Sequence, residues 1–338
     1  MAALVLTYDA DATQEKLRER IAARGIDDVH IVETQRYPGE IGLTVHQDQG
    51  RLTGWLHLPD ADVPLDRVRA VWTHRWADAT GLPAAWPDDV RRTTLAEAEA
   101  VLVGVLEALP GALRINPAPL DRQGQHKLLL HEVARRVGLE VPATYAGNDA
   151  AAARAFRGDR SLVVKHLTAW APPGTIGASA LFTKRLVPAH LDDAASVQLS
   201  PLLLQEEIGK QVELRVVIVG RRVFCGSIDP STVPGAEVDW RTGHRVGPSP
   251  WRRDALPPDV EARVLALMDA LGLQYGAADV IRTPDGRHVF LEVNPSGGFL
   301  WIDRLHDGAI LDAFLDLLRD PALARPTVFP TASPVAAS

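Results

Sequence analysis

The stretch HVFLEVNPSGG, residues 288–298, decides how the fold of this chain is read. Its apolar and β-branched residues predict a strand that ends at Pro295. Side chains alternate between the two faces of a strand, so each face is expected to carry every second residue. One face would hold His288, Phe290, Glu292 and Asn294, and the other Val289, Leu291 and Val293. The strand therefore places a carboxylate and an amide together, opposite an apolar face.

A second carboxylate lies on the strand that precedes this one. QYGAADVIRT (274–283) and RHVFLEVN (287–294) flank the turn PDG, so they are expected to pair as a hairpin that brings Asp279 beside Glu292. With Asn294, these side chains form a set of hard oxygen ligands of the kind that Mg²⁺ prefers. The glycines after Pro295 let a ligand approach closely. The alternative is a solvated sheet face that carries ordinary acids.

Cations for a phosphate site are also present. Lys165 ends the apolar strand 161–166, where it is either a surface residue or a phosphate ligand, and Lys127 begins a helix predicted over 127–137. Gly174 and Gly177 lie in the loop APPGTIGASA, which is suited to folding over a triphosphate through its backbone N–H groups. No Walker motif (GxxxxGK[ST]) is present.

The run LLLQEEIGKQVELRVVIVG (202–220) predicts two further strands. The strand-to-loop edge at Glu206, Glu207 and Ile208 can present backbone groups to an adenine. Glu213 can accept hydrogen bonds from the two hydroxyls of a ribose, and the guanidinium of Arg215 suits a phosphate or a carboxylate. A half-exposed alternating strand is the plainer interpretation of residues 213–215.

The order of the elements predicts several domains. Strands at 3–8, 29–33, 68–75 and 112–116 alternate with helices at 11–24 and 88–109, which is typical of a small parallel α/β domain, with a hairpin at 43–58. We expect an N-terminal domain over 1–118, a central domain with the glycine-bearing loop over 119–207, and a C-terminal domain with the metal site over 208–325. The small, Pro-rich segment 326–338 is expected to be a disordered tail.

Composition excludes several classes of protein. The chain has 338 residues, 46% of them hydrophobic and 23% charged, which is typical of a globular protein. A net charge of −7 argues against a nucleic-acid binder. The single cysteine, Cys225, lies in an apolar strand, which favours a buried residue and a reducing cytoplasm. We find no signal peptide and no run long enough to span a membrane.

These motifs, taken in order, resemble the ATP-grasp superfamily over residues 115–320. Within it, VELRVVIVGRRVFCGSID, VDWR (238–241) and YGAADVIRTPDGRHVFLEVNPSGGFLWID resemble the graspetide, or microviridin-type, peptide macrocyclases. VRAVWTHRW (68–76) is similar to their N-terminal strand, with His74-Arg75 where the family has paired arginines. The resemblance implies an α/β (α+β) ATP-grasp fold, in which antiparallel-sheet domains clasp ATP behind a parallel N-terminal domain.

The resemblance also implies a role for each matching residue. Lys127 and Lys165 would contact the phosphates of ATP, and Glu206, Glu207, Ile208 and Glu213 would bind adenine and ribose. Asp279, Glu292 and Asn294 would hold Mg²⁺, with two ions expected. Arg215 and Lys165 would act in catalysis. Arg75, Asp239, Trp240 and Arg241 would bind the substrate, and the loop 230–256 as a whole, with Trp251, Arg252 and Arg253, is a candidate surface for an acidic peptide or else a mobile surface loop.

The function that the resemblance implies is an ADP-forming ligase of the cytoplasm. It would phosphorylate Asp or Glu side chains of a ribosomal precursor peptide, made of a leader and a Thr/Ser/Lys- and Asp/Glu-bearing core, and close ester or amide cross-links. A homodimer is possible. One alternative is a ligase that joins an amino acid to a small molecule or a peptide terminus. The other is a non-catalytic nucleotide-binding regulatory protein.

Overall fold

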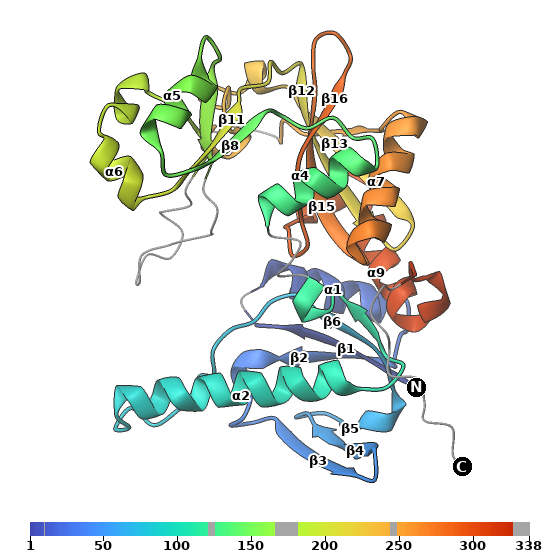
Figure 1. Ribbon diagram of the computed structural model, residues 1–338. Helices are drawn as coiled ribbons and strands as arrows, with labels where there is room; N and C mark the ends of the chain where they lie inside the picture. The colour runs from blue at the N-terminus through green and yellow to red at the C-terminus, as the bar shows by residue number, and fades with distance from the viewer. Residues whose placement is uncertain (10, 121–125, 166–181, 244–248, 327–338) are drawn as a thin grey trace.

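The computed structural model describes residues 1–9, 11–120, 126–165, 182–243 and 249–326. The chain folds into an N-terminal α/β domain, drawn at the bottom of Figure 1, and two antiparallel sheets above it. The loop 171–180 and the tail from Thr327 onward lie outside the described residues, so the predictions made for them stay predictions. None of the described helices is long and apolar enough to cross a membrane.

The predicted parallel sheet of the N-terminal domain is confirmed. Its strands β1 (Ala2–Thr7), β2 (Val29–Glu33), β6 (Val68–Thr73) and β7 (Leu113–Ile115) run parallel in the order β2-β1-β6-β7. Alternate residues of β1 face opposite layers: Leu4 packs with Leu102 of helix α2 (Asp88–Ala108), and Val5 with Leu17 of helix α1 (Ala12–Ala23). The side chain of Asp11 caps α1 by accepting from the backbone N–H of Thr13 at 3.0 Å.

A small antiparallel sheet extends this domain. Strands β3 (Gly42–Asp48) and β4 (Arg51–His57) form the predicted hairpin, and β5 (Asp62–Pro64) adds a third strand that the sequence did not predict. Buried Leu56 and Val63 face the same core as Leu4 and Leu102. Short 3₁₀ turns η1 (Thr34–Arg36) and η2 (Leu65–Arg67) connect these strands to the parallel sheet.

The central domain is an antiparallel sheet with two differently covered faces. Its strands β8 (Thr144–Gly147), β9 (Leu162–Lys165), β10 (Lys184–Arg185) and β11 (Leu202–Glu206) lie in the order β10-β9-β11-β8. Leu162 and Leu204 pack against the helices α5 (Ala150–Arg157) and α6 (Ala194–Leu199), which the sequence did not predict. The turn η3 (Pro188–Leu191) precedes α6. The opposite face carries Val163, Lys165 and Gln205.

The C-terminal domain is built on a larger antiparallel sheet. Its strands are β12 (Val212–Val219), β13 (Arg222–Ile228), β14 (Arg252–Asp254), β15 (Tyr275–Arg282) and β16 (His288–Asn294), in the order β14-β13-β12-β15-β16. One face is largely apolar: Leu214 and Val216 belong to the same buried cluster as Leu130 of helix α4 (Lys127–Arg136) and Leu267 of helix α7 (Pro258–Leu271). α7 ends at Gly272, whose φ of 68° is in the left-handed region.

The other face of this sheet changes character halfway along β12. Val217 and Val219 are buried against helix α9 (Ala309–Arg319), which also contacts β1, β2 and β6 of the N-terminal domain. Glu213 and Arg215, on the same face of the strand, lie beyond α9. Helix α8 (Leu300–Leu305) precedes α9, and the turn η6 (Pro321–Leu323) follows it. One sheet face therefore docks the N-terminal domain at one end and presents polar groups at the other.

A β-bulge on β16 corrects the predicted face assignment. Asp279 is in register with Glu292, but Val280 is in register with Phe290, so Leu291 is an extra residue on β16. The bulge resets the alternation. Phe290, expected beside Glu292, is instead fully buried with Val280 and Val293 in the core under α4 and α7. That expectation was wrong, whereas the predicted pairing of Asp279 with Glu292 is confirmed.

The described residues of the segment 230–256 contain little regular structure, as predicted, apart from the turns η4 (Pro230–Thr232) and η5 (Trp240–Thr242) and strand β14. One residue departs from the expectation of a surface loop. Trp251 is only 3% exposed and belongs to the cluster that joins the C-terminal sheet to α8 and α9. Trp251 is therefore a core residue and not part of a peptide-binding surface.

Candidate active site

A pocket lies between the open face of the central sheet and the polar half of the C-terminal sheet. The central sheet contributes Val163, Lys165 and Gln205, and the C-terminal sheet contributes Glu213, Asp279, Ile281, Leu291 and Glu292. The rim is formed by the strand-to-loop edge and by the segment before β14, with Thr183, Glu206, Glu207, Ile208, Lys210, Val238, Asp239, Trp240 and Arg241. Ten of the residues predicted from the sequence thus line one pocket.

Two lysines from different elements, Lys127 of α4 and Lys165 of β9, face Glu292. Lys127, on the first turn of α4, donates a hydrogen bond to Glu292 Oε2, and the two side chains form an ion pair. Burial raises the pKa of Glu292, but the positive charges of Lys165 and Lys127 outweigh burial and lower the pKa to about 2. Burial also lowers the pKa of Lys165, against the attraction of Glu292. The carboxylate is therefore ionised at neutral pH and stabilises a desolvated lysine.

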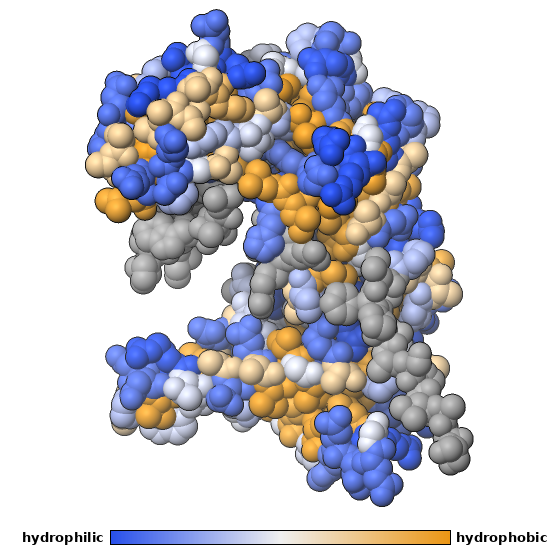
Figure 2. All heavy atoms as spheres, viewed as in Figure 1, coloured by the Kyte–Doolittle hydropathy of each residue, from blue (hydrophilic) through white to orange (hydrophobic). Residues whose placement is uncertain are grey.

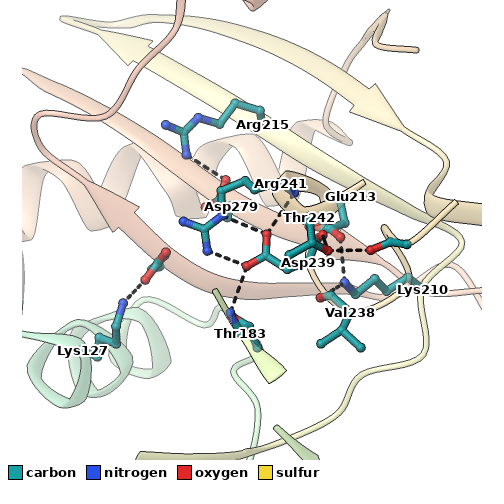
Figure 3. Close-up of polar contacts among 12 residues, drawn as sticks. Lys127, Thr183, Lys210, Glu213, Arg215, Val238, Asp239, Arg241, Thr242 and Asp279 are labelled. Carbon is teal, nitrogen blue, oxygen red and sulfur yellow. Dashed lines mark hydrogen bonds and ion pairs between the residues drawn. The ribbon is translucent and has the colours of Figure 1, made fainter. Parts of the chain in front are cut away.

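Arg215 is held by contacts on three sides. Its guanidinium donates to Asp279 Oδ1 at 2.9 Å and to the carbonyl of Gly298 at 2.9 Å, and it lies 5.5 Å from the ring centre of Trp301. Gly297 is needed here, because a Cβ at this position would lie 2.6 Å from an Arg215 nitrogen. Figure 3 shows Arg215 and Asp279 on neighbouring strands. Of the guanidinium nitrogens, Nε is buried and has no partner among the described residues.

Glu213 lies at the other end of the pocket with a lysine that the sequence analysis did not single out. Lys210 donates to Glu213 Oε1 at 2.7 Å and to the carbonyl of Val238 at 2.6 Å. Burial raises the pKa of Glu213, and the charge of Lys210 offsets part of this rise. Lys210 lies two residues after Ile208, where the predicted adenine edge ends. This position was the only indication in the sequence that Lys210 lies at the pocket.

Asp239 organises the rim that closes over the pocket. It accepts from Arg241 through both carboxylate oxygens, at 2.8 and 2.6 Å, and from the backbone N–H of Thr183 at 3.1 Å (Figure 3). Burial raises the pKa of Asp239, but the hydrogen bonds and charge of Arg241 lower it overall. The guanidinium of Arg241 lies 5.5 Å from the ring centre of Phe182, and its side chain is 45% exposed. Arg241 is thus rigidly held yet open to a ligand.

Gln205 is a pocket residue that the sequence analysis did not assign. It is 1% exposed and lies on β11 in register with Thr144 and Val163. Its Nε2 donates to Thr144 Oγ1 at 3.4 Å, while Oε1 is buried and has no partner among the described residues. The signal available in the sequence was a lone amide directly after the apolar run Leu202–Leu204. Beside it, Glu207 forms an ion pair with Arg185 at 2.8 Å.

Four predicted residues lie outside the pocket lining: Lys127 and Arg215, which pair with two of its acids, and Asn294 and Arg75. Asn294 is exposed and accepts from the backbone N–H of Ser296 at 2.9 Å. Arg75 follows β6 in the N-terminal domain, next to buried His74, whose Nε2 lies 3.0 Å from Asp11 Oδ2. Within the described part of the chain, no three His, Cys, Asp or Glu side chains gather as a ready metal cluster. Asp279 and Glu292 are the two acids placed to share a cation.

The donor set fits a divalent cation with a polyphosphate. Asp279 and Glu292 are hard oxygen ligands in register on adjacent strands, and each is now paired with a cationic side chain. Lys165, in contrast, has no ion pair within the described residues, and its cationic group faces the two acids from the opposite sheet. A phosphate chain placed between the sheets would meet Lys165 and Lys127, and a divalent cation would replace those lysines as counter-charge to Glu292.

Comparisons with known proteins agree with this architecture. The MvdD pre-ATP grasp domain family matches residues 2–122. The RiPP-associated ATP-grasp ligase of Chryseobacterium gregarium, solved with ADP and a leader and core peptide, is 27% identical, with a TM-score of 0.85 over 97% of this chain and 98% of that chain. Macrocyclase MdnC of Microcystis aeruginosa, bound with precursor peptide MdnA, is 28% identical, with a TM-score of 0.80 over 94% of this chain and 99% of that chain.

A third structure gives the same result. Macrocyclase MdnB of Microcystis aeruginosa is 29% identical, with a TM-score of 0.74 over 94% of this chain and 98% of that chain. No curated protein matched the sequence. The expected ATP-grasp fold is confirmed, and the chain is similar over nearly its whole length to RiPP-associated ATP-grasp ligases.

Proposed function

We propose, on the premise of this ATP-grasp fold, that the protein is an ATP-dependent ligase that cross-links side chains of a ribosomally made precursor peptide. The observation that carries the proposal is the pocket between the two sheets, which Asp279, Glu292 and Lys165 line, while Lys127 and Arg215 form ion pairs with the two acids. The relatives solved with ADP and with leader and core peptides support the choice of substrates.

ATP with Mg²⁺ supplies the phosphoryl group that converts a carboxylate of the peptide into an acyl-phosphate, whose phosphate can leave. We assign Asp279, Glu292 and Asn294 to the metal, and Lys127 and Lys165 to the phosphates. Glu206, Glu207 and Ile208 would border the adenine, and Glu213 would bind the ribose. Lys210 would hold Glu213 for that contact, since it already bonds to it.

Arg215 is suited to the reacting carboxylate. Asp279 and the carbonyl of Gly298 fix its guanidinium, and this preorganisation means that little reorganisation is needed as charge develops on the transferring group. A Ser, Thr or Lys side chain of the same peptide would then attack the acyl group and release phosphate. Positioning of two groups on one chain supplies much of the rate advantage in such a reaction.

The peptide is expected to enter where the pocket meets the outside of the molecule. Asp239, Trp240 and Arg241 form the rim of the pocket. Figure 2 shows a deep recess between the central domain and the N-terminal domain. Arg75 lies on the N-terminal side. ATP and a reduced Cys225 both fit a cytoplasmic reaction.

The test is intact-mass spectrometry of a short peptide rich in Ser, Thr, Lys, Asp and Glu that is encoded beside this gene. With enzyme, ATP and Mg²⁺, we expect loss of one or more waters from the peptide, with matching ADP and no AMP. Glu292→Gln should abolish the change while ATP still binds. An unchanged peptide, with ADP released only when free amino acids are added, would indicate a small-molecule ligase. ATP binding without phosphate release for any acceptor would indicate a non-catalytic protein.

A further inference from the structure

A second cavity lies apart from the active-site pocket, between elements of the N-terminal and C-terminal domains. It has a volume of about 670 Å³ and shares no lining residue with the pocket between the two sheets. Its walls come from the end of α2 and the chain that follows as far as Pro119, from the turn between β12 and β13, and from η6 and the residues after it. This volume is within the range of roughly 300–1,000 Å³ that is typical of small-molecule sites.

Most of the lining of this second cavity is apolar and rigid. Alanine and leucine side chains alternate with five prolines, which are Pro110, Pro117, Pro119, Pro321 and Pro326. Because the ring of a proline fixes the φ angle of its residue, these walls keep their shape in the absence of a ligand. Preorganised apolar walls favour a rigid ligand with a hydrocarbon body, since little conformational freedom is lost on binding.

The charged residues of the lining are three arginines and one acid: Arg114, Arg221, Arg325 and Glu107. The acid is already engaged. Glu107 Oε1 accepts from the backbone N–H of Ala118 at 3.2 Å, and Oε2 lies 3.5 Å from Arg114 Nε. With three positive charges against one negative charge, the lining has a net charge of +2 and favours an anion.

Arg325 is the most deeply buried of these cations. Its side chain is 1% exposed and forms an ion pair with Asp269 at 2.8 Å, and Nη1 donates to the carbonyl of Gly220 at 3.1 Å. Its Nε is buried and has no acceptor in the part of the chain that the structure describes. Burial lowers the pKa of Arg325 against the attraction of Asp269, and the like charge of Arg221 lowers it further. An anion bound beside the two arginines would relieve this repulsion.

Arg221 supplies the cation that a ligand can reach. It lies in the turn between β12 and β13, is exposed, and has no acid paired with its guanidinium among the described residues. The next residue, Arg222, is paired with Asp316 at 3.2 Å and lies outside the lining of the cavity. A guanidinium without a counter-ion presents a planar set of donors that suits a carboxylate or a similar oxyanion.

We propose that this cavity is a second ligand site, which binds a small organic acid whose apolar body packs on the proline walls and whose anionic group pairs with Arg221. The inference goes beyond the proposed ligase activity, because it uses no residue of the active-site pocket. A ligand in this cavity would contact the end of α2 on one side and the turn between β12 and β13 on the other, so it would link the N-terminal domain to the C-terminal domain.

The test uses two fluorescent probes of similar shape. Anilinonaphthalene sulfonate is an aromatic acid, and phenylnaphthylamine is its neutral counterpart without the anionic group. Each probe is titrated into the full-length protein with ADP and Mg²⁺ present, so that the active-site pocket does not compete for it. Arg221→Gln should weaken binding of the acid about tenfold and leave binding of the amine unchanged, because only the acid pairs with the guanidinium. Ala322→Phe, which places a ring in the cavity, should weaken both probes.

Arg222→Gln provides a matched control, because it removes the same charge from the adjacent residue outside the cavity. It should leave both dissociation constants unchanged. Equal weakening of the acid by Arg221→Gln and Arg222→Gln, or no binding of the acid to the wild type, would overturn the inference. Tighter binding of the acid to Phe329→Ser would also overturn it, since the chain's own residues after Pro326 would then be the occupant. None of these readouts depends on ligase activity, so this inference and the proposed function can fail separately.

Discussion

Lys127, on the first turn of α4, is bonded to Glu292 of β16, which lies far from it in the sequence. Lys165 reaches the same carboxylate electrostatically from the central sheet. A carboxylate flanked by two lysines from two elements has its charge more than balanced. An incoming polyphosphate requires such a surplus of positive charge.

The charge state of Glu292 predicts how stability depends on pH. The pKa of Glu292 is about 2 in the folded protein, below its ordinary value of 4.5. Between these values the unfolded state binds more protons, so the stabilisation that the carboxylate provides is complete above about pH 5 and is lost as pH falls. The difference in unfolding free energy between wild type and Glu292→Gln should therefore shrink by about 1 kcal/mol from pH 4.5 to 3.5. Urea denaturation without nucleotide measures it, and a difference that stays constant or grows contradicts the assignment.

Gly297 should be needed for the position of Arg215. A Cβ at this residue would lie 2.6 Å from an Arg215 nitrogen and 2.7 Å from Ala277 Cβ. Gly297→Ala should displace the guanidinium and lower the single-turnover rate of peptide modification at least about tenfold, since small misplacements are costly in catalysis. Gly209→Ala, at the pocket edge, is the control, because its Cβ would meet nothing within 4 Å. Equal single-turnover rates for Gly297→Ala and Gly209→Ala would contradict the prediction that the reaction depends on the position of Arg215.

Arg241 should act on the peptide more than on the nucleotide. Its guanidinium forms a fork with Asp239 and remains 45% exposed at the rim. Arg241→Lys keeps the charge but loses the fork, so the KM for the peptide should rise roughly tenfold while the dissociation constant of ATP changes little. Arg185→Lys is the control, because Arg185 also contacts both carboxylate oxygens of one acid, Glu207, but does not line the pocket. A larger effect on ATP than on the peptide would reassign Arg241 to the nucleotide.

Cys225 should be chemically silent in the native protein. It is 3% exposed on β13, and burial raises the pKa of its thiol to about 12. A disulfide reagent at pH 8 should therefore label no thiol in the folded chain and one thiol in denaturant. Labelling of the native protein at a rate similar to that of a free thiol would disprove the burial of β13.

Much of this site could be predicted from the sequence, because its acids and cations lie on strands with clear patterns. Asp279 and Glu292 pair across a turn that PDG marks plainly, so their register was accessible. The face on which Phe290 lies could not be predicted from the sequence. The bulge depends on how β16 pairs with β15 and on the hydrogen bond between His131 and the carbonyl of Leu291, and both are tertiary contacts. Strict alternation therefore failed at the bulge: Phe290 is buried in the core, and Leu291 lines the pocket together with Glu292.

Other misses have similar physical causes. Helix α5 is an alanine-rich segment of only eight residues, shorter than the window over which a helical repeat can be recognised, and it is stabilised by packing of Ala150 and Ala153 on the central sheet. Gln205 looks like an ordinary polar interruption of an apolar strand until Thr144 is placed beside it. Trp251 looks like a surface aromatic in a Pro-rich loop, yet it packs 5.1 Å from Trp240 and 6.1 Å from Trp301, ring centre to ring centre.

Helix α9 has a consequence for synthesis of the chain. It supplies Ile310, Phe314 and Leu317 to the layer that covers Val5 and Trp72, so the N-terminal domain buries one of its sheet faces against a helix that is made much later. Until about residue 319 has emerged, that face stays exposed on a nascent chain. The N-terminal domain should therefore depend on chaperones during translation, and shortened chains that end before α9 should be cleared by proteases.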